Sequence, residues 1–164
     1  MKNIILVVDD DKTNLALAQK ILLPQYRIAA SNSGMAALKY LEHNRPDLIL
    51  LDINMPDMDG FAVMEELKKK EETASIPVIF LTADNLAETE IRCFRVGAMD
   101  FVAKPFVPDI LLSRVGKTIE LHEYRHNLEK MVKEQAEKLM ENTRRISMIQ
   151  DSVIVGMANL IESR

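Results

Sequence analysis

The feature that most constrains this chain is a continuous apolar run, Leu48–Leu51, that stops at the carboxylate of Asp52. Because the run is apolar without alternation, it predicts a strand buried on both faces, and such strands occur in parallel sheets covered by helices. Ligands of open parallel sheets bind beyond the carboxyl ends of the strands, so Asp52 stands where a site can form. Taken alone, Asp52 is better explained as an ordinary turn or cap residue.

The same pattern of a short buried strand followed by a helix recurs along the chain. Four more segments have the composition of such strands, at residues 4–8, 26–30, 76–81 and 101–103. Helical apolar spacing occurs in four intervening segments, at residues 13–23, 33–43, 61–70 and 86–96. Strict alternation of this kind predicts a five-stranded parallel sheet with helices on both faces and right-handed connections. The carboxyl ends of the strands are therefore expected to converge on one rim.

That rim would gather polar side chains from four separate strands. They are Asp9, Asp10, Asp11, Asp52, Thr82 and Lys104. Carboxylates this close together repel one another unless a cation lies among them, and oxygen ligands at this density suit Mg²⁺. Because Mg²⁺ commonly binds carboxylates together with phosphate oxygens, we interpret Thr82 and Lys104 as phosphoryl contacts. Taken singly, a helix N-cap threonine and a surface lysine are the more ordinary interpretations.

The rim residues lie in four short motifs. These are Val7-Val8-Asp9-Asp10, Leu51-Asp52-Ile53-Asn54-Met55-Pro56, Leu81-Thr82-Ala83 and Lys104-Pro105-Phe106. Together they resemble the receiver domain of two-component response regulators, over about residues 3–118. The resemblance implies an α/β, flavodoxin-like, doubly wound (βα)5 fold. It also implies that Lys104 precedes a cis proline.

The resemblance assigns a role to each carboxylate. Asp52 would accept a phosphoryl group from a histidine kinase or phosphotransfer protein. Asp10 and Asp52 would bind Mg²⁺ directly, Asp9 would hold a metal-bound water, and Asn54 would contribute its backbone carbonyl. A carboxylate nucleophile that forms an acyl phosphate, with a metal ion to offset the charge, is sound chemistry for such a set.

The resemblance further implies a conformational switch made of Thr82 and Phe101. Thr82 and Lys104 would contact the phosphoryl oxygens. Phe101 stands where many members of the family have a tyrosine. We therefore expect that this ring can become buried on phosphorylation but cannot offer a hydroxyl at the surface.

Two other interpretations of the rim stay open. Asp9-Asp10-Asp11-Lys12-Thr13 also fits the Asp-x-Asp-x-Thr pattern of haloacid-dehalogenase-type phosphatases, with Asp9 as the nucleophile. The chain has no obvious later acidic pair for that family's metal site and little room for a cap domain, and Asp52 would remain unexplained. A phosphorylation-independent dimeric scaffold with a degenerate site is the second interpretation. The joint presence of all the rim residues disfavours it.

His122-Glu123-Tyr124-Arg125-His126 matches the His-Glu-x-x-His pattern of zinc proteases. On a helix this spacing places both imidazoles on one face. However, the segment is charged, and no convincing third ligand follows it. We interpret the two histidines as solvent-facing residues.

The chain after Pro108 has the pattern of one long helix. Proline suits a first helical turn, and no other proline follows. Apolar residues recur every seven positions, with a companion set three positions later: Val132, Leu139, Ile146, Val153 and Leu160, with Leu121, Leu128 and Ile149. This heptad seam predicts a parallel two-stranded coiled coil whose register Gln135 and Asn142 would fix. The alternative is a helix packed back onto its own receiver.

From about Ile146 the helix becomes apolar over a wider arc, which indicates contact with a further domain. Residues 151–164 are similar to the opening helix of HD-GYP cyclic-di-GMP phosphodiesterases. The His-Asp ligands and the Gly-Tyr-Pro motif of that family are absent from this sequence. We therefore expect a receiver at 1–118 and a coiled-coil linker at 119–164 that leads to an output domain. The chain itself is expected to be a phosphoacceptor, not an enzyme.

Composition limits the partners and the location. A net charge of -4 and a pI near 5.4 argue against direct nucleic-acid binding, which normally requires a basic surface. No apolar run reaches membrane-spanning length, so no membrane insertion is expected. The single cysteine, Cys93, excludes an internal disulfide and fits a reducing compartment. These features predict a cytoplasmic protein.

Overall fold

The structure is a computed structural model that describes residues 2–163. Its centre is one five-stranded sheet in which every strand pair is parallel, in the order β2-β1-β3-β4-β5. The strands are β1 (Ile4–Val8), β2 (Arg27–Ser31), β3 (Leu48–Asp52), β4 (Val78–Thr82) and β5 (Asp100–Ala103). This confirms the flavodoxin-like, doubly wound parallel sheet that the sequence predicted.

The helices are α1 (Lys12–Leu22), α2 (Gly34–Leu41), α3 (Gly60–Lys68), α4 (Glu71–Ala74), α5 (Ala87–Arg95) and α6 (Pro108–Glu162). The first three begin at side-chain caps: the side chains of Asp11, Ser33 and Asp59 each accept a hydrogen bond from a backbone N–H of the first turn. The sequence did not predict α4. The buried Thr73 stabilises this turn, because its hydroxyl donates 2.7 Å to the carbonyl of Leu67 at the end of α3.

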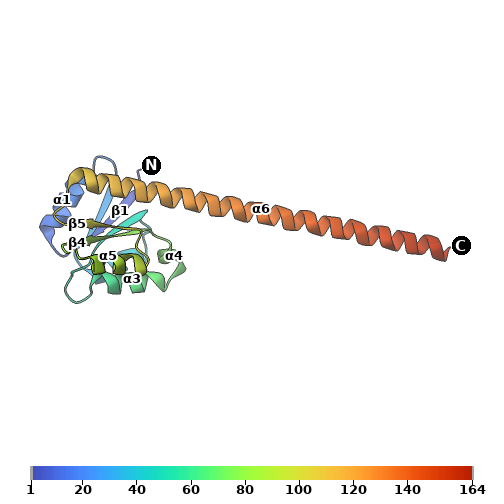
Figure 1. The fold of residues 1–164 in the computed structure, drawn as a ribbon, viewed down its shortest axis with the longest axis horizontal. Coiled ribbons are helices and arrows are strands. Elements are labelled where there is room, and N and C mark those ends of the chain that lie inside the picture. The colour runs from blue at the N-terminus through green and yellow to red at the C-terminus, as the bar shows by residue number, and fades with distance from the viewer. Residues whose placement is uncertain (1, 164) are drawn as a thin grey trace. The chain divides into compact units, whose positions relative to one another are not determined.

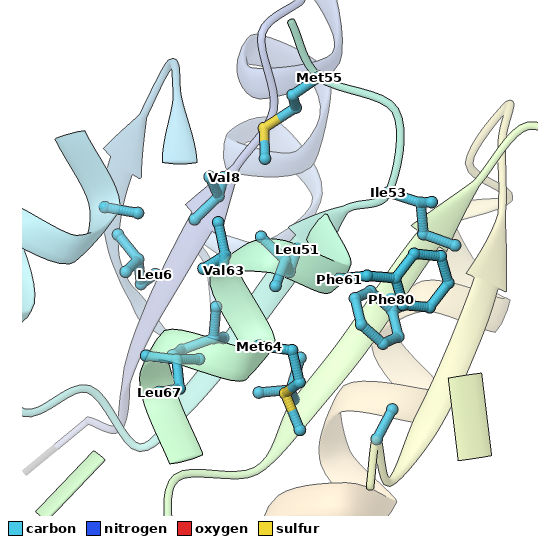
Figure 2. Close-up of a cluster of buried hydrophobic side chains, with 14 of the residues drawn as sticks. Leu6, Val8, Leu51, Ile53, Met55, Phe61, Val63, Met64, Leu67 and Phe80 are labelled. Carbon is cyan, nitrogen blue, oxygen red and sulfur yellow. The ribbon is translucent and has the colours of Figure 1, made fainter. Parts of the chain in front are cut away.

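Two apolar clusters lie on the two faces of the sheet. Alternate residues of each strand point to opposite faces, so Leu6 and Val8 of β1 join one cluster while Ile5 and Val7 join the other. Helices α2, α3 and α5 cover the first face, and α1 with the beginning of α6 covers the second. Figure 1 shows α3 and α5 on one side of β4 and β5 and the beginning of α6 on the other. Figure 2 shows the first cluster, in which the rings of Phe61 and Phe80 lie 5.1 Å apart. This three-layer packing buries the central strands completely.

The described residues divide into two compact units, with the boundary between His122 and Glu123. The first unit holds the sheet, both apolar clusters and the beginning of α6. The second consists of the rest of α6, and all its described residues, from 123 to 163, are exposed. The predicted long helix is confirmed as one uninterrupted element. Within residues 2–163, no helix has the length and apolar character required to cross a membrane.

Candidate functional site

The carboxyl ends of the strands bring the predicted residues to one rim. β1 and β3 are neighbours in the middle of the sheet, and β4 follows β3. Asp9 comes directly after β1, Asp52 and Thr82 are the last residues of β3 and β4, and Lys104 comes directly after β5. Because the strands are parallel and start in similar register, their ends lie side by side.

The ammonium group of Lys104 connects two buried carboxylates. Its Nζ lies 3.2 Å from Asp9 Oδ2 and 3.0 Å from Asp52 Oδ1. The side chains of Asp9 and Asp52 are only 1% and 2% exposed, and that of Lys104 is 14% exposed. Charges this deeply buried must be paired, since an isolated buried charge is strongly destabilising. The peptide bond between Lys104 and Pro105 is cis, as the family resemblance implied.

Backbone N–H groups of the following residues donate hydrogen bonds to both carboxylates. Asp9 Oδ1 accepts a hydrogen bond of 2.9 Å from the N–H of Asp11, and Asp52 Oδ1 accepts one of 3.3 Å from the N–H of Asn54. Asp11, which the sequence placed among the rim residues, does not belong to this carboxylate cluster. Its side chain accepts 2.7 Å from the N–H of Thr13 and caps α1, so it is a structural residue here.

The predicted acidic set forms one cluster. Asp9, Asp10 and Asp52 each offer a carboxylate oxygen, and the three oxygens lie within 4.8 Å of one another. Among the described residues, no other group of three or more His, Cys, Asp or Glu side chains lies this close together. Three carboxylates facing one ammonium group leave two negative charges uncompensated, and Asp10 is exposed enough for a hydrated ion to reach it. Hard oxygen donors with a deficit of two positive charges fit Mg²⁺.

The electrostatics of the cluster change the pKa values of Asp52 and Lys104. Burial raises the pKa of Asp52, the contact with Lys104 opposes this shift and the charge of Asp9 adds to it, so that the pKa lies at about 6. For Lys104, burial alone lowers the pKa, but the hydrogen bonds and charges of Asp52 and Asp9 outweigh it, so its pKa lies above the ordinary value. An added cation would therefore stabilise the ionised form of Asp52, and Lys104 stays charged.

The loop after β3 lies against the end of the strand. A Cβ atom on Gly60 would come within 2.4 Å of the Asp52 carbonyl oxygen, so only glycine fits at this position. The N–H of Gly60 donates 2.9 Å to the carbonyl of Ile53, and Asp57 has a φ of 65° in the left-handed region. These features close the loop tightly under Asp52. The sequence indicated a turn here but not the close approach of Gly60 to the strand.

Thr82 makes its hydrogen bonds within its own loop. Its hydroxyl donates 2.9 Å to the carbonyl oxygen of Asp84 and accepts 3.0 Å from the N–H of Asp84. The carboxylate of Asp84 in turn accepts hydrogen bonds from the N–H of Leu86 and from the hydroxyl of Thr89. The loop between β4 and α5 is thus organised around Asp84, which the sequence reasoning did not identify. An aspartate two residues after a strand-end threonine, followed by a helix, is a turn signal that would have suggested it.

Phe101 is half-buried and lies between two helices. Its ring contacts Phe94 of α5 edge to face at 5.8 Å, and the guanidinium of Arg114 in α6 lies 6.0 Å from its centroid. In the sheet register Thr82 pairs with Ala103, so Phe101 lies two residues from the partner of Thr82. The contact with Arg114 has no signal in the sequence, because it depends on the packing of α6 against β5.

The two histidines of the zinc-protease pattern lie outside this site. His126 is exposed, whereas His122 is half-buried, so the expectation that both face solvent was wrong for His122. Neither belongs to the acidic group described above.

Comparison with known proteins agrees with this geometry. The chain matches the response regulator receiver domain family over residues 5–116, and it belongs to that family. This confirms the resemblance seen in the four motifs.

Individual relatives show what the chain is similar to. It is 36% identical over 98% of its length to a probable cyclic di-GMP phosphodiesterase of Vibrio cholerae, and it spans 36% of that protein. It is 30% identical over 96% of its length to the probable transcriptional regulator ycf29 of Porphyra purpurea, of which it covers 77%. The crystal structure of the Vibrio cholerae chemotaxis protein CheY4 matches with a TM-score of 0.69 at 27% identity, over 72% of this chain and 99% of that one.

Proposed function

We propose that this protein is a Mg²⁺-dependent receiver that takes a phosphoryl group onto Asp52 from a histidine kinase or phosphotransfer protein. The observation that carries the proposal is the single lysine that bridges two buried carboxylates at the rim of the sheet, with Lys104 Nζ at 3.2 and 3.0 Å from Asp9 and Asp52. An ordinary surface ion pair is exposed to solvent, whereas the carboxylates of Asp9 and Asp52 are buried. A phosphoryl site needs both the nucleophile and a fixed positive charge beside it.

In the transfer step, a carboxylate oxygen of Asp52 attacks phosphorus while the bond from phosphorus to the donor's imidazole nitrogen breaks. The products are an acyl phosphate on Asp52 and a free imidazole on the donor. Lys104 provides a point charge for a phosphoryl oxygen. The hydroxyl of Thr82 donates a hydrogen bond to the carbonyl of Asp84 in this structure. Once that bond breaks, the hydroxyl can donate a hydrogen bond to a second phosphoryl oxygen.

Asp10 and Asp52 would hold Mg²⁺ directly, Asp9 through a water molecule, and Asn54 through its backbone carbonyl. The cluster fits the ion because its three carboxylates carry an excess of two negative charges over Lys104. When bound, Mg²⁺ neutralises charge on the phosphoryl group as it transfers. The chain acts as a phosphoacceptor, which is consistent with its membership of the receiver family.

The signal would leave through α6, which we propose forms a parallel homodimer. The heptad residues of the second unit are exposed along the whole helix: Leu128 is 48% exposed, Val132 62%, Leu139 68% and Ile146 58%. A sustained apolar stripe on an exposed helix indicates a partner surface, and a second copy supplies a stripe of the same length. In this division, residues 1–118 are the receiver and residues 119–164 are the linker. A phosphorylation-independent scaffold would use the same dimer with an inactive Asp52.

The output is proposed to be cyclic-di-GMP hydrolysis by a domain that follows this segment. The relative named as a probable cyclic di-GMP phosphodiesterase aligns with 98% of the chain. The similarity to ycf29 makes transcriptional control the alternative output. We favour the first because residues 151–164 are similar to the opening helix of HD-GYP phosphodiesterases and because the identity to the phosphodiesterase relative is higher, 36% against 30%. A cytoplasmic location is part of the same proposal.

The test is the intact mass of the protein after incubation with acetyl phosphate. We expect one phosphoryl adduct on the wild type in Mg²⁺, none in EDTA, and none on Asp52→Asn. Absence of an adduct on the wild type, with a second phosphodonor giving the same result, would support the scaffold. An adduct that persists in Asp52→Asn would support Asp9 as the nucleophile.

A further inference from the structure

Arg114 joins the output helix to the strand that carries the switch residue. Its Nη1 donates to both carboxylate oxygens of Asp100, at 2.7 and 2.9 Å. Asp100 Oδ1 also accepts 2.9 Å from the N–H of Phe101. The guanidinium carbon lies 6.0 Å from the centroid of the Phe101 ring. One cation from α6 is therefore bound, directly or through Asp100, to both the ring and the backbone of Phe101.

The Phe101 ring also contacts α5. Phe94 meets it edge to face, with an angle of 75° between the rings and 5.8 Å between the centroids. Aromatic pairs of this geometry and arginine over an aromatic face are both attractive. Phe101 thus contacts both a ring from α5 and a cation from α6. A movement of this ring away from α6 would break the contact with Arg114.

The ion pair adds little to stability by itself. The side chain of Arg114 is 46% exposed, and solvent screens exposed pairs strongly. Its arrangement is more informative than its strength. A carboxylate that binds the arginine and also the N–H of the next residue fixes the guanidinium at one place relative to the Phe101 ring. The pair restrains one side chain rather than the whole fold.

We propose that Arg114 is a positioning residue that holds Phe101 in the position seen here and so opposes the rearrangement that phosphorylation favours. The inference rests on the proposed function and on the joint rearrangement of Thr82 and Phe101 that the family resemblance implies. A ligand that favours the rearranged state has to break the Arg114 contact, and by linkage that contact weakens the ligand's binding. Because Arg114 belongs to α6, its release changes the contacts of the output helix directly.

The proposal is tested by measuring the affinity of the protein for beryllium trifluoride, a non-covalent mimic of the phosphoryl group, in the presence of Mg²⁺. Loss of a cation–π contact and a restrained ion pair should tighten binding to Arg114→Ala by about three- to tenfold. Arg114→Lys, which keeps the charge but loses the planar fork, should fall between this variant and the wild type. Arg145→Ala is the matched control, since Arg145 forms a similar ion pair with Glu141 on α6 but touches no aromatic ring. Its affinity should equal that of the wild type.

Repeating the Arg114→Ala substitution in a Phe101→Leu variant distinguishes an effect through the Phe101 ring from a general structural effect of Arg114. In Phe101→Leu there is no ring for Arg114 to hold, so adding Arg114→Ala should leave the affinity unchanged. A merely structural arginine would alter binding equally in both backgrounds. Unchanged or weaker binding to Arg114→Ala, with the wild type binding normally, would overturn this inference alone. Failure of the wild type to bind the mimic would overturn the proposed function together with it.

Discussion

The two units of this chain use apolar residues in opposite ways. In the first unit, the apolar residues of the strands are almost entirely buried, and Leu111 at the start of α6 is 0% exposed. In the second unit, Leu139 lies on the same helix and is 68% exposed. Both are leucines on α6, yet only the first packs its side chain into an apolar cluster. The first unit can therefore be stable as a monomer, while the second requires another molecule or a further domain to bury its apolar stripe.

The contrast extends to the charged residues. At the rim, Asp9, Asp52 and Lys104 are buried and contact one another, whereas the ion pair of Glu141 with Arg145 on α6 is largely exposed. Buried charges are sensitive to any added ion, whereas exposed pairs are screened by solvent. Chemistry is therefore expected in the first unit and association in the second.

The largest expected effect comes from comparing the two leucines. Leu111→Ala should lower the free energy of unfolding by about 2–5 kcal/mol at every protein concentration, because it leaves a cavity in the core. Leu139→Ala should instead weaken the dimer and leave the unfolding of a dilute monomer unchanged. Chemical denaturation at several protein concentrations measures both. A concentration-independent loss in Leu139→Ala would contradict the proposed coiled coil.

Removing the buried cation should have the next largest effect. Lys104→Ala leaves Asp9 and Asp52 facing each other, and loss of one member of a buried charge set is expected to destabilise the metal-free protein by about 3 kcal/mol. Mg²⁺ should restore part of this loss, since it supplies the missing positive charge. Thermal unfolding with EDTA and with Mg²⁺ measures both effects. Lys69→Ala, which removes a lysine from an exposed pair, is the control and should leave the transition temperature unchanged.

Asp52 should make stability depend on pH. Burial raises its pKa from 3.8 to about 6, so the folded protein binds the proton more tightly than the unfolded chain does. The free energy of unfolding in EDTA should then fall as the pH rises from about 4 to about 6, and Asp52→Asn should remove this fall. At pH 7 the variant should be more stable than the wild type by about 1–3 kcal/mol, with no difference near pH 3. Equal stability of the wild type and Asp52→Asn at pH 7 would show that burial does not disfavour the ionised form of Asp52.

The smallest expected effect concerns the loop after β4. Asp84→Ala removes the acceptor for the N–H of Leu86 and the hydroxyl of Thr89, and it should destabilise the fold by about 1 kcal/mol, as loss of a helix cap does. Asp84→Asn keeps one acceptor oxygen and should recover most of the loss. Urea denaturation of the two variants checks this. An Asn variant as unstable as the Ala variant would mean that the negative charge, and not the hydrogen bonds, holds the loop.

The sequence predicted the parallel sheet well, because apolar runs such as 48–51, which are buried on both faces, alternate with helical segments along the chain. It also placed Asp9, Asp52 and Lys104 at one rim, since parallel strands align their ends. It could not show that Asp11 caps α1 or that Asp84 organises the loop of Thr82, because short polar residues near strand ends serve either purpose. The contact of Arg114 with Phe101 depends on how α6 packs against β5, and no local pattern encodes that.

Trapping the acyl phosphate tests the central claim most directly. Borohydride reduces an aspartyl phosphate to homoserine, and peptide mass spectrometry then identifies the modified position. After incubation with acetyl phosphate and Mg²⁺, we predict homoserine at position 52 and unmodified peptides around Asp9, Asp10 and Asp11. Homoserine at position 9, or an unmodified position 52 in protein that carries a phosphoryl adduct, would contradict the account.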